Sequence, residues 1–289
     1  MKKWAKNTQR NHIIVEHNND SGSVDEQAYI KKLTSDVRVV SIVHTSPVTG
    51  MTVDLEKITK EVRNVTPDCI IIVDGIQHSS HGAIDVQKYD IDGYVVSPYK
   101  MFSRHGYGVA WASDRLCTLN KEQLADGPFQ NWELGTRDAG SYATFSDVVD
   151  YLDWLGSNFA ESEKTRERLE ASSIAIKSHE QELVDLVING AEDIVGLRNN
   201  KKIRIIGNSA STSREGVVSF FHKNKPSRII VEELRQRKIR VHIRKDDHYC
   251  GNILRPLNQK DCIRFSICHY NSKAEVVEFM KAINEISTN

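Results

Sequence analysis

The sequence lacks several features that would place a protein in a special class. No apolar run is long enough to span a bilayer, and the N-terminus has no apolar segment of a secretory signal. Basic and acidic side chains both number 39, so no excess of charge favours nucleic acid or an anionic membrane, and a neutral chain is prone to self-association. We expect a cytoplasmic protein without a nucleic-acid or membrane partner.

Cysteine is also scarce. The five cysteines are odd in number and have no metal-ligand spacing, which favours a reduced cytosolic chain over a disulfide framework. The spacing of His78 and His81 could suggest a metal, but no carboxylate or thiol completes a site beside them. We therefore expect loop histidines and no metal centre.

What is present in the first half is an alternation of strand and helix patterns. Short apolar, β-branched runs indicate buried strands, and apolar residues at helical spacing indicate helices between and after them. Such alternation is typical of an α/β fold with a doubly wound, mostly parallel sheet. The expected strands are 37–44, 69–73, 93–96 and 108–112, the expected helices are 54–65, 145–158 and 161–189, and the stretch 113–140 is irregular.

A second pattern begins near residue 202 and predicts a smaller α+β unit. It contains four strand patterns, at 203–206, 216–222, 239–243 and 262–267, and two helical patterns, at 226–237 and 272–286. We therefore expect a large domain over residues 1–158, a linking helix over 159–200 and a C-terminal α+β domain over 201–289.

Three polar side chains follow the strands of the predicted parallel sheet. Asp74 ends one strand, and Ser97 and Lys100 follow another. Ligands of such sheets bind beyond the carboxyl ends of the strands. An amine for a Schiff base, an acid for a pyridinium nitrogen and a hydroxyl for a phosphate suit a pyridoxal phosphate site. Taken singly, Lys100 would be a solvated side chain and Asp74 a cap or turn former.

Four ordered blocks extend this pattern over most of the chain, at residues 44–50, 73–77, 92–108 and 264–271. In these blocks the chain resembles the class V aminotransferase and cysteine desulfurase family, pyridoxal phosphate enzymes of fold type I. The resemblance implies an α/β large domain that binds the cofactor and a small C-terminal domain.

The resemblance also implies roles for individual residues at the cofactor. Lys100 would form the internal aldimine, Asp74 would pair with the pyridinium nitrogen and Gln77 with the phenolic oxygen. Ser97 would bind the phosphate, and Tyr99 occupies a position where relatives have a histidine that is a further phosphate ligand.

Two more residues extend these roles to the substrate and to a partner subunit. Arg264 resembles the arginine that binds the substrate carboxylate, a task that suits a planar bidentate fork; the alternative is an ordinary arginine on an edge strand. Thr136 resembles a threonine that reaches the phosphate bound by a partner subunit. That role implies a homodimer with shared sites.

Cys250 bears on the reaction. In some cysteine desulfurases a cysteine on a similar loop attacks the substrate sulfur, which requires an exposed thiolate, and His248 and Lys245 could lower its pKa. The alternative is a small buried thiol.

By the same resemblance, the chain starts inside the family's large domain, so that its first helices and a phosphate-binding turn would be missing. Pro47 stands where relatives commonly have an asparagine, and proline cannot donate that side-chain hydrogen bond.

The sequence thus leaves two functions open. One is a pyridoxal phosphate enzyme acting on an amino acid, as a cysteine desulfurase, C–S lyase or aminotransferase. The other is an inactive relative that acts as an interaction protein, or as one subunit of a split enzyme whose second chain supplies the front part.

Overall fold

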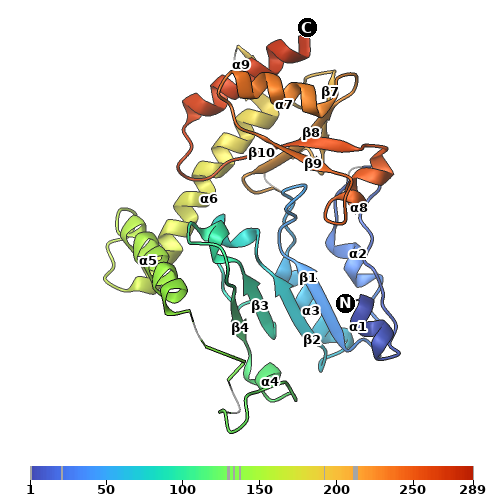
Figure 1. Cartoon of the computed structure of the whole chain (residues 1–289), viewed down its shortest axis with the longest axis vertical. Helices are drawn as coiled ribbons and strands as arrows, with labels where there is room; N and C mark the ends of the chain where they lie inside the picture. The colour runs from blue at the N-terminus through green and yellow to red at the C-terminus, as the bar shows by residue number, and fades with distance from the viewer. Residues whose placement is uncertain are drawn as a thin grey trace.

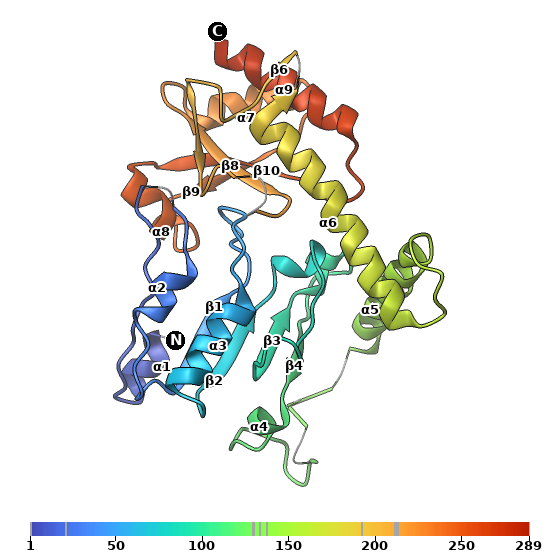
Figure 2. The same ribbon diagram turned by 180° about the vertical axis from the view of Figure 1, so that it is seen from behind.

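The chain folds into two four-stranded sheets that lie one above the other, each with its own helices (Figure 1). The computed structural model describes residues 2–20, 22–128, 131, 132, 134–136, 138–191, 193–210 and 214–288. Within these residues no helix is both long enough and apolar enough to cross a membrane. The long helix α6 (Thr165–Asn189) runs from beside the first sheet to the second (Figures 1 and 2).

The first sheet confirms the predicted α/β class. Its strand order is β1-β2-β3-β4; β1 to β3 are parallel to one another, and β4 is antiparallel to β3. Its strands are β1 (Val39–Val43), β2 (Ile70–Asp74), β3 (Gly93–Val96) and β4 (Val109–Ala112).

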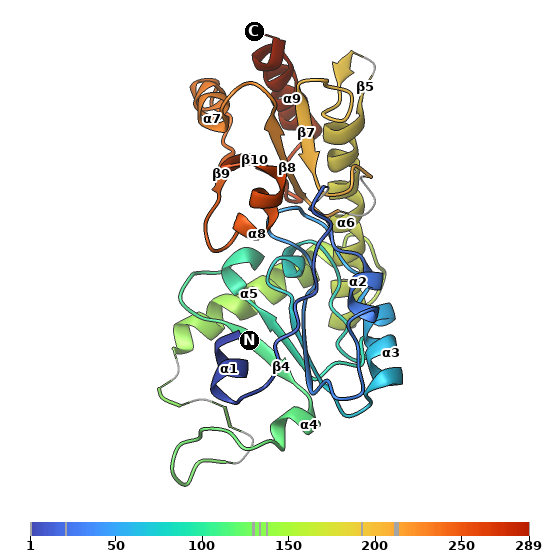
Figure 3. The same ribbon diagram turned by 90° about the vertical axis from the view of Figure 1, so that its right-hand side faces the viewer.

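Helix α3 (Leu55–Val65) connects β1 to β2 and covers one face of this sheet (Figure 3). It begins where Asp54 accepts a hydrogen bond from the Lys57 amide at 3.0 Å. Its apolar residues pack on Ile42, Ile71 and Val73. The opposite face is less covered, since Ile72 and Val95 are only half-buried and Val43 is 44% exposed.

The remaining helical elements before the second sheet are short apart from α5. They are α1 (Lys2–Asn7), α2 (Glu26–Ile30), the 3-10 turns η1 (His78–Ser80) and η2 (Pro98–Met101), α4 (Asp114–Cys117) and α5 (Ala139–Gly156). Helix α5 begins before the predicted residue 145 because Asp138 caps it, accepting from the Ser141 amide at 3.2 Å.

The second sheet is antiparallel, with the order β7-β8-β10-β9. Helices α6, α7 and α9 pack on one of its faces around Phe220, Ile263 and Phe279. The bounds are β7 (Ile203–Ile206), β8 (Val217–His222), α7 (Ser227–Gln236), β9 (His242–Lys245), α8 (Gly251–Leu254), η4 (Arg255–Leu257), β10 (Asp261–Ser266) and α9 (Lys273–Thr288), with a small hairpin of β5 (Gly190–Ala191) and β6 (Ile194–Val195) ahead of them. The domain boundaries at 158 and 200 stay a prediction.

The strand predicted over 239–243 is wrong by about three residues, because β9 begins at His242. The residues just before it form the turn that follows α7, where Lys238 has a φ of 64° and the Ile239 amide donates to the Leu234 carbonyl at 2.9 Å. Val241 is buried in the core although it lies outside the ladder. The apolar pattern therefore indicated which residues are buried, whereas the start of the strand depends on backbone pairing with β10.

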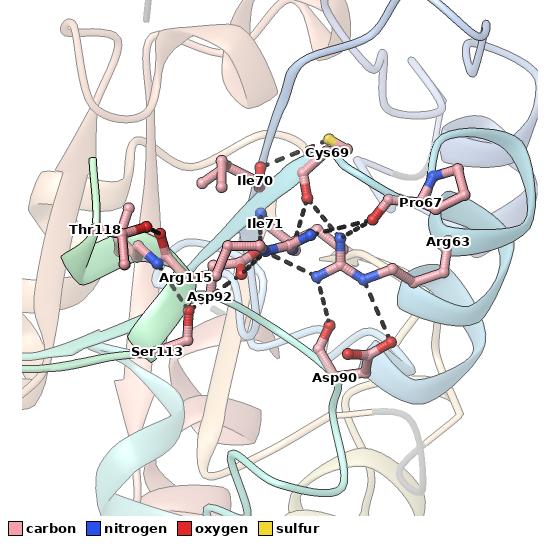
Figure 4. A network of polar contacts seen from close by, with 11 residues as sticks. Arg63, Pro67, Cys69, Ile70, Ile71, Asp90, Asp92, Ser113, Arg115 and Thr118 are labelled. Atoms are coloured by element: carbon pink, nitrogen blue, oxygen red, sulfur yellow. Dashed lines mark hydrogen bonds and ion pairs between the residues drawn. The ribbon is translucent and has the colours of Figure 1, made fainter. Parts of the chain in front are cut away.

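A polar clamp ties β2, β3, α3 and α4 together at the amino end of β3 (Figure 4). The carboxylate of Asp92 is 3% exposed and accepts from Arg63, from Arg115 and from the Ile71 amide. Both arginines also donate to the Cys69 carbonyl. This clamp lies just before β3, at the opposite end from Ser97.

Candidate active site

The carboxyl ends of β1, β2 and β3 meet at one edge of the first sheet, because these strands are parallel. The loop 45–50 leaves this edge and contacts the second sheet. The Pro47 carbonyl accepts from Arg264 Nη1 at 3.1 Å, and the Ser219 hydroxyl donates to the Val48 carbonyl. The strand ends that carry Asp74 and Ser97 therefore face the inner surface of the second sheet, where Arg264 lies.

Lys100 lies in the turn η2 directly after β3. Its Nζ donates to Gln77 Oε1 at 2.8 Å. Burial, then the positive charge of Arg264, lowers the pKa of Lys100 to about 8, although Asp74 opposes the shift. A larger share of this amine is therefore neutral and nucleophilic near neutral pH than of an exposed lysine.

The turn that contains Lys100 ends at Phe102, whose backbone has an uncommon conformation. Phe102 follows η2 with a φ of 71°, in the left-handed region that a residue with a side chain seldom adopts. Its ring meets His269 edge-on, with centroids 4.9 Å apart. This contact with the segment after β10 holds the lysine turn against the second half of the molecule.

Asp74 and Gln77 come from the tight turn after β2. Asp74 Oδ1 accepts from the Ile76 amide at 3.0 Å, and none of the described residues donates to its other oxygen. Only glycine fits between them at position 75, since a Cβ there would lie 2.1 Å from the Tyr94 ring. The Gln77 side chain is buried, and its Nε2 lies 3.0 Å from His81 Nε2.

Two arginines on neighbouring strands of the second sheet face the site. Arg264 is on β10, and Arg244 is on β9. The Nε atoms of both are buried and make no hydrogen bond within the described residues. Burial, then the charge of Arg244, lowers the pKa of Arg264. Two partly unsatisfied guanidinium groups near Lys100 suit an anionic ligand.

The other three residues predicted to bind the cofactor, Ser97, Tyr99 and Thr136, are more exposed than Gln77. Ser97 is half-buried, and its carbonyl accepts from the Lys100 amide at 2.9 Å. Tyr99 is 40% exposed and stacks on His105 with a centroid distance of 4.2 Å. Thr136 is exposed and makes no hydrogen bond with another described residue.

Cys250 is not placed as an exposed nucleophile. It is 1% exposed, and it packs with Val48, Phe221 and Cys262 in an apolar cluster. Its amide donates to Asp247 Oδ1 at 3.0 Å. This placement matches the alternative interpretation of a small buried thiol.

His78 and His81 lie in the loop after β2, at the turn η1, and make contacts that the sequence did not predict. Both are buried, and each contacts a glutamate: His78 Nδ1 lies 2.5 Å from Glu215 Oε1, and His81 Nδ1 lies 2.6 Å from Glu180 Oε2. The glutamates are 137 and 99 residues away in the chain, so no local pattern could reveal them. Within the described residues no group of three such side chains could hold a metal ion.

His44 adds an aromatic surface at the end of β1. It stacks on His78 with a centroid distance of 3.7 Å, and its Nδ1 lies 2.9 Å from the Tyr94 hydroxyl. Burial, then the proximity of His78, lowers the pKa of His44 to about 2, so this ring is neutral.

These residues fit pyridoxal phosphate in donor type. An amine with a lowered pKa, an acid with one oxygen that accepts from no described residue, a buried amide and two partly unsatisfied arginines converge at the carboxyl ends of parallel strands. A fold and a site of this kind define a pyridoxal phosphate protein of the α/β class.

The family follows from comparison with known proteins. The sequence profile of aminotransferase class-V matches residues 2–279, and the chain belongs to this family, whose members depend on pyridoxal phosphate. It is 23% identical over 280 residues to a probable cysteine desulfurase of Treponema pallidum (strain Nichols), covering 92% of this chain and 63% of that protein. It is 26% identical over 272 residues to an aminotransferase-like protein of Gibberella zeae, covering 91% of this chain and 62% of that one.

A solved structure with the same fold is the apo cysteine desulfurase of Thermococcus onnurineus NA1. The TM-score is 0.79 at 19% identity, over 99% of this chain and 68% of that one. The chain thus spans less than two thirds of the length of the two curated relatives.

Proposed function

We propose that this chain takes part in a pyridoxal phosphate-dependent reaction of an amino acid, with Lys100 holding the cofactor. The observation that carries the proposal is the environment of the Lys100 amine. The amine donates to Gln77, and its pKa is lowered to about 8 by burial and by the charge of Arg264, although the charge of Asp74 opposes this shift. The amine would bind the aldehyde carbon of the cofactor covalently with loss of water.

The bound cofactor supplies an electron sink for charge that develops at the substrate's α-carbon. Asp74 would keep the pyridinium nitrogen protonated, Gln77 would donate to the phenolic oxygen, and the Ser97 hydroxyl, with Tyr99 beside it, would contact the phosphate. Arg264 would bind the substrate carboxylate, and the Lys100 amine would move a proton at the α-carbon. The names of the relatives favour desulfuration or transamination, and C–S lysis fits the same residues.

Cys250 would act as a sulfur nucleophile only after its loop opened. Its cluster of Val48, Phe221 and Leu254 excludes solvent from the thiol in the present arrangement. A desulfurase that uses Cys250 is therefore the less supported version of this proposal.

A homodimer with shared sites completes the proposal. Thr136 is exposed, as a residue that serves a partner's phosphate would be. A cytoplasmic location stays a prediction.

Reduction with borohydride tests the central claim. Protein incubated with pyridoxal phosphate should develop a new absorbance band, and borohydride should fix the pyridoxyl group on the peptide that contains Lys100. The Lys100→Ala variant should lose both signals, while Lys88→Ala, at a lysine on the surface, should keep them. A label spread evenly over surface lysines would sink the proposal.

A second candidate is a non-catalytic interaction protein, or one subunit of a split enzyme whose second chain supplies further elements. The half-open face of the first sheet favours it, since Val43 is 44% exposed there and Ile72 and Val95 are half-buried. Native mass spectrometry of protein purified from its own cells would show a stoichiometric second chain. A homodimer that captures cofactor on Lys100 would argue against this candidate.

A further inference from the structure

A continuous line of polar contacts leads from Lys100 into the interior. Lys100 Nζ donates to Gln77 Oε1 at 2.8 Å, Gln77 Nε2 lies 3.0 Å from His81 Nε2, and His81 Nδ1 lies 2.6 Å from Glu180 Oε2. The side chains of His81 and Glu180 are each only 3% exposed. The line joins the turn after β3, the turn after β2 and helix α6.

The donor and acceptor roles along this line depend on one another. The Lys100 ammonium can only donate, so it selects the carbonyl end of Gln77, and the amide nitrogen must then face His81. That nitrogen can also only donate, so His81 Nε2 must accept. The ring proton of His81 is then on Nδ1, where Glu180 accepts it.

A further proton on the pair would reverse these roles. With both ring nitrogens protonated, His81 Nε2 donates, and Gln77 has to turn its carbonyl toward His81. The amide N–H groups of Gln77 then face Lys100, which loses its acceptor, so this state suits a Lys100 that is neutral or bound to the cofactor. Burial alone would lower the pKa of His81, but the hydrogen bond and charge of Glu180 outweigh burial and raise this pKa. The pair of His81 and Glu180 therefore binds the further proton more readily than a free histidine does.

A small cavity and several polar side chains border the pair. The cavity has a volume of about 30 Å³, enough for one water molecule, and Glu180 Oε1 is buried without a partner among the described residues. The charged or titratable groups around the pair include Lys100 and, from other elements, Lys177, His179, Arg214, Glu215, Cys268, His269 and Tyr270.

We propose that His81 and Glu180 are positioning residues: the proton they share selects which end of the Gln77 amide faces Lys100. In one state the amide offers an acceptor to the lysine, and in the other it offers a donor to the phenolic oxygen of the cofactor. The first half of this inference is the link between the proton on His81 and the orientation of Gln77, and it concerns only residues of this chain. The second half is the contact of Gln77 with the cofactor, and it rests on the proposed function.

Nuclear magnetic resonance of the cofactor-free protein tests the first half. In protein with ¹⁵N-labelled histidine, long-range proton–nitrogen correlations at pH 9 should show His81 protonated on Nδ1 and bare on Nε2. Lys100, with its pKa of about 8, is mostly neutral at this pH, but the Glu180 carboxylate can only accept and so still requires the proton on Nδ1. Lowering the pH should protonate Nε2. A wild-type His81 that carries its proton on Nε2 at pH 9 would overturn the inference, whether or not the protein binds cofactor.

Cofactor affinity tests the second half. Glu180→Gln removes the charge that lets His81 hold a second proton, so pyridoxal phosphate should bind roughly tenfold more weakly, the effect of one lost hydrogen bond to a charged oxygen. The control is Glu215→Gln, at a histidine–glutamate pair that does not contact Gln77 and whose glutamate acts on His81 through charge alone, without a hydrogen bond. It should weaken cofactor binding clearly less than Glu180→Gln does.

A double-mutant cycle separates positioning from general damage. In the Gln77→Met background no amide remains to be turned, so adding Glu180→Gln should have no further effect on affinity. A full additional loss there would refute the positioning role. If wild-type protein takes no borohydride label on Lys100, the proposed function fails, while the state of His81 still decides the first half.

Discussion

At the residue scale, the chemistry of the site depends on the environment of one amine. Lys100 lies in the turn that follows β3. Burial and the positive charges of Arg264 and Arg244 both disfavour its ammonium form. The nearby carboxylate of Asp74 limits that effect. The lysine is therefore prepared for nucleophilic attack by groups from both sheets.

We predict that the capture of pyridoxal phosphate follows the neutral fraction of Lys100. The rate of cofactor capture should rise about tenfold per pH unit below about pH 8 and level off above it, because the amine is mostly neutral once the pH exceeds its pKa of about 8. Removing the nearby charge in Arg264→Gln should move the profile to higher pH. Stopped-flow absorbance measures both, and a wild-type profile still rising at pH 10 would contradict the placement of this lysine.

At the element scale, the clamp at Asp92 holds strand ends in place on the side away from the site (Figure 4). Burial alone would raise the pKa of Asp92. Hydrogen bonds from Arg115, the Ile71 amide and Arg63 outweigh burial and lower the pKa. The clamp joins β2, α3 and α4 to the segment before β3, so it fixes the register on which Asp74 and Ser97 depend.

We predict that Asp92→Asn destabilises the protein by about 3 kcal/mol at pH 7, because it leaves Arg63 facing a neutral group in a buried network. The folded pKa of Asp92 lies below its unfolded value of about 4, so its contribution is present above that pH and is lost as the pH falls through the folded pKa. Urea unfolding from pH 7 to pH 3 should show the difference from wild type shrinking.

The control for this prediction is Asp90→Asn. Asp90 also contacts Arg63, but its side chain is 72% exposed, and its loss should cost less than about 0.5 kcal/mol. Equal losses for the two variants would show that burial does not decide the effect.

At the scale of the whole molecule, the loop 45–50 connects the two sheets. Its carbonyl groups accept from Arg264, Ser219 and Arg214, all of which belong to the second half of the chain. Gly50 lies against the second sheet with a φ of 75°, and a Cβ added there would lie only 2.1 Å from the Val217 carbonyl oxygen. The distance between the lysine edge and the arginine strand depends on this loop.

We predict that Gly50→Ala lowers stability by about 1–3 kcal/mol, since the added carbon meets backbone and the left-handed conformation is strained for alanine. Gly135→Ala is the control, because a Cβ there meets nothing within 4 Å, and its effect should stay within about 0.5 kcal/mol. The urea midpoint measures both. An unchanged midpoint for Gly50→Ala would mean that the sheets are not held this closely.

The sequence by itself determined the fold class and the order of the cofactor residues. Strand and turn signals are local, so β2 with Asp74 and β3 with Lys100 could be placed from apolar runs and the residues that follow them. Strand β9 was misplaced, because pairing with β10 rather than apolar content set its start.

Only the tertiary structure decided how the site is supported. Glu180, Glu215 and Arg244 reach it from distant segments, and their contacts leave no signal in the neighbouring sequence. Whether Cys250 is an exposed nucleophile or a packing thiol likewise depended on the elements around it. Hydrogen bonds and burial act through space, and a chain pattern reports them only where the partners are close in sequence.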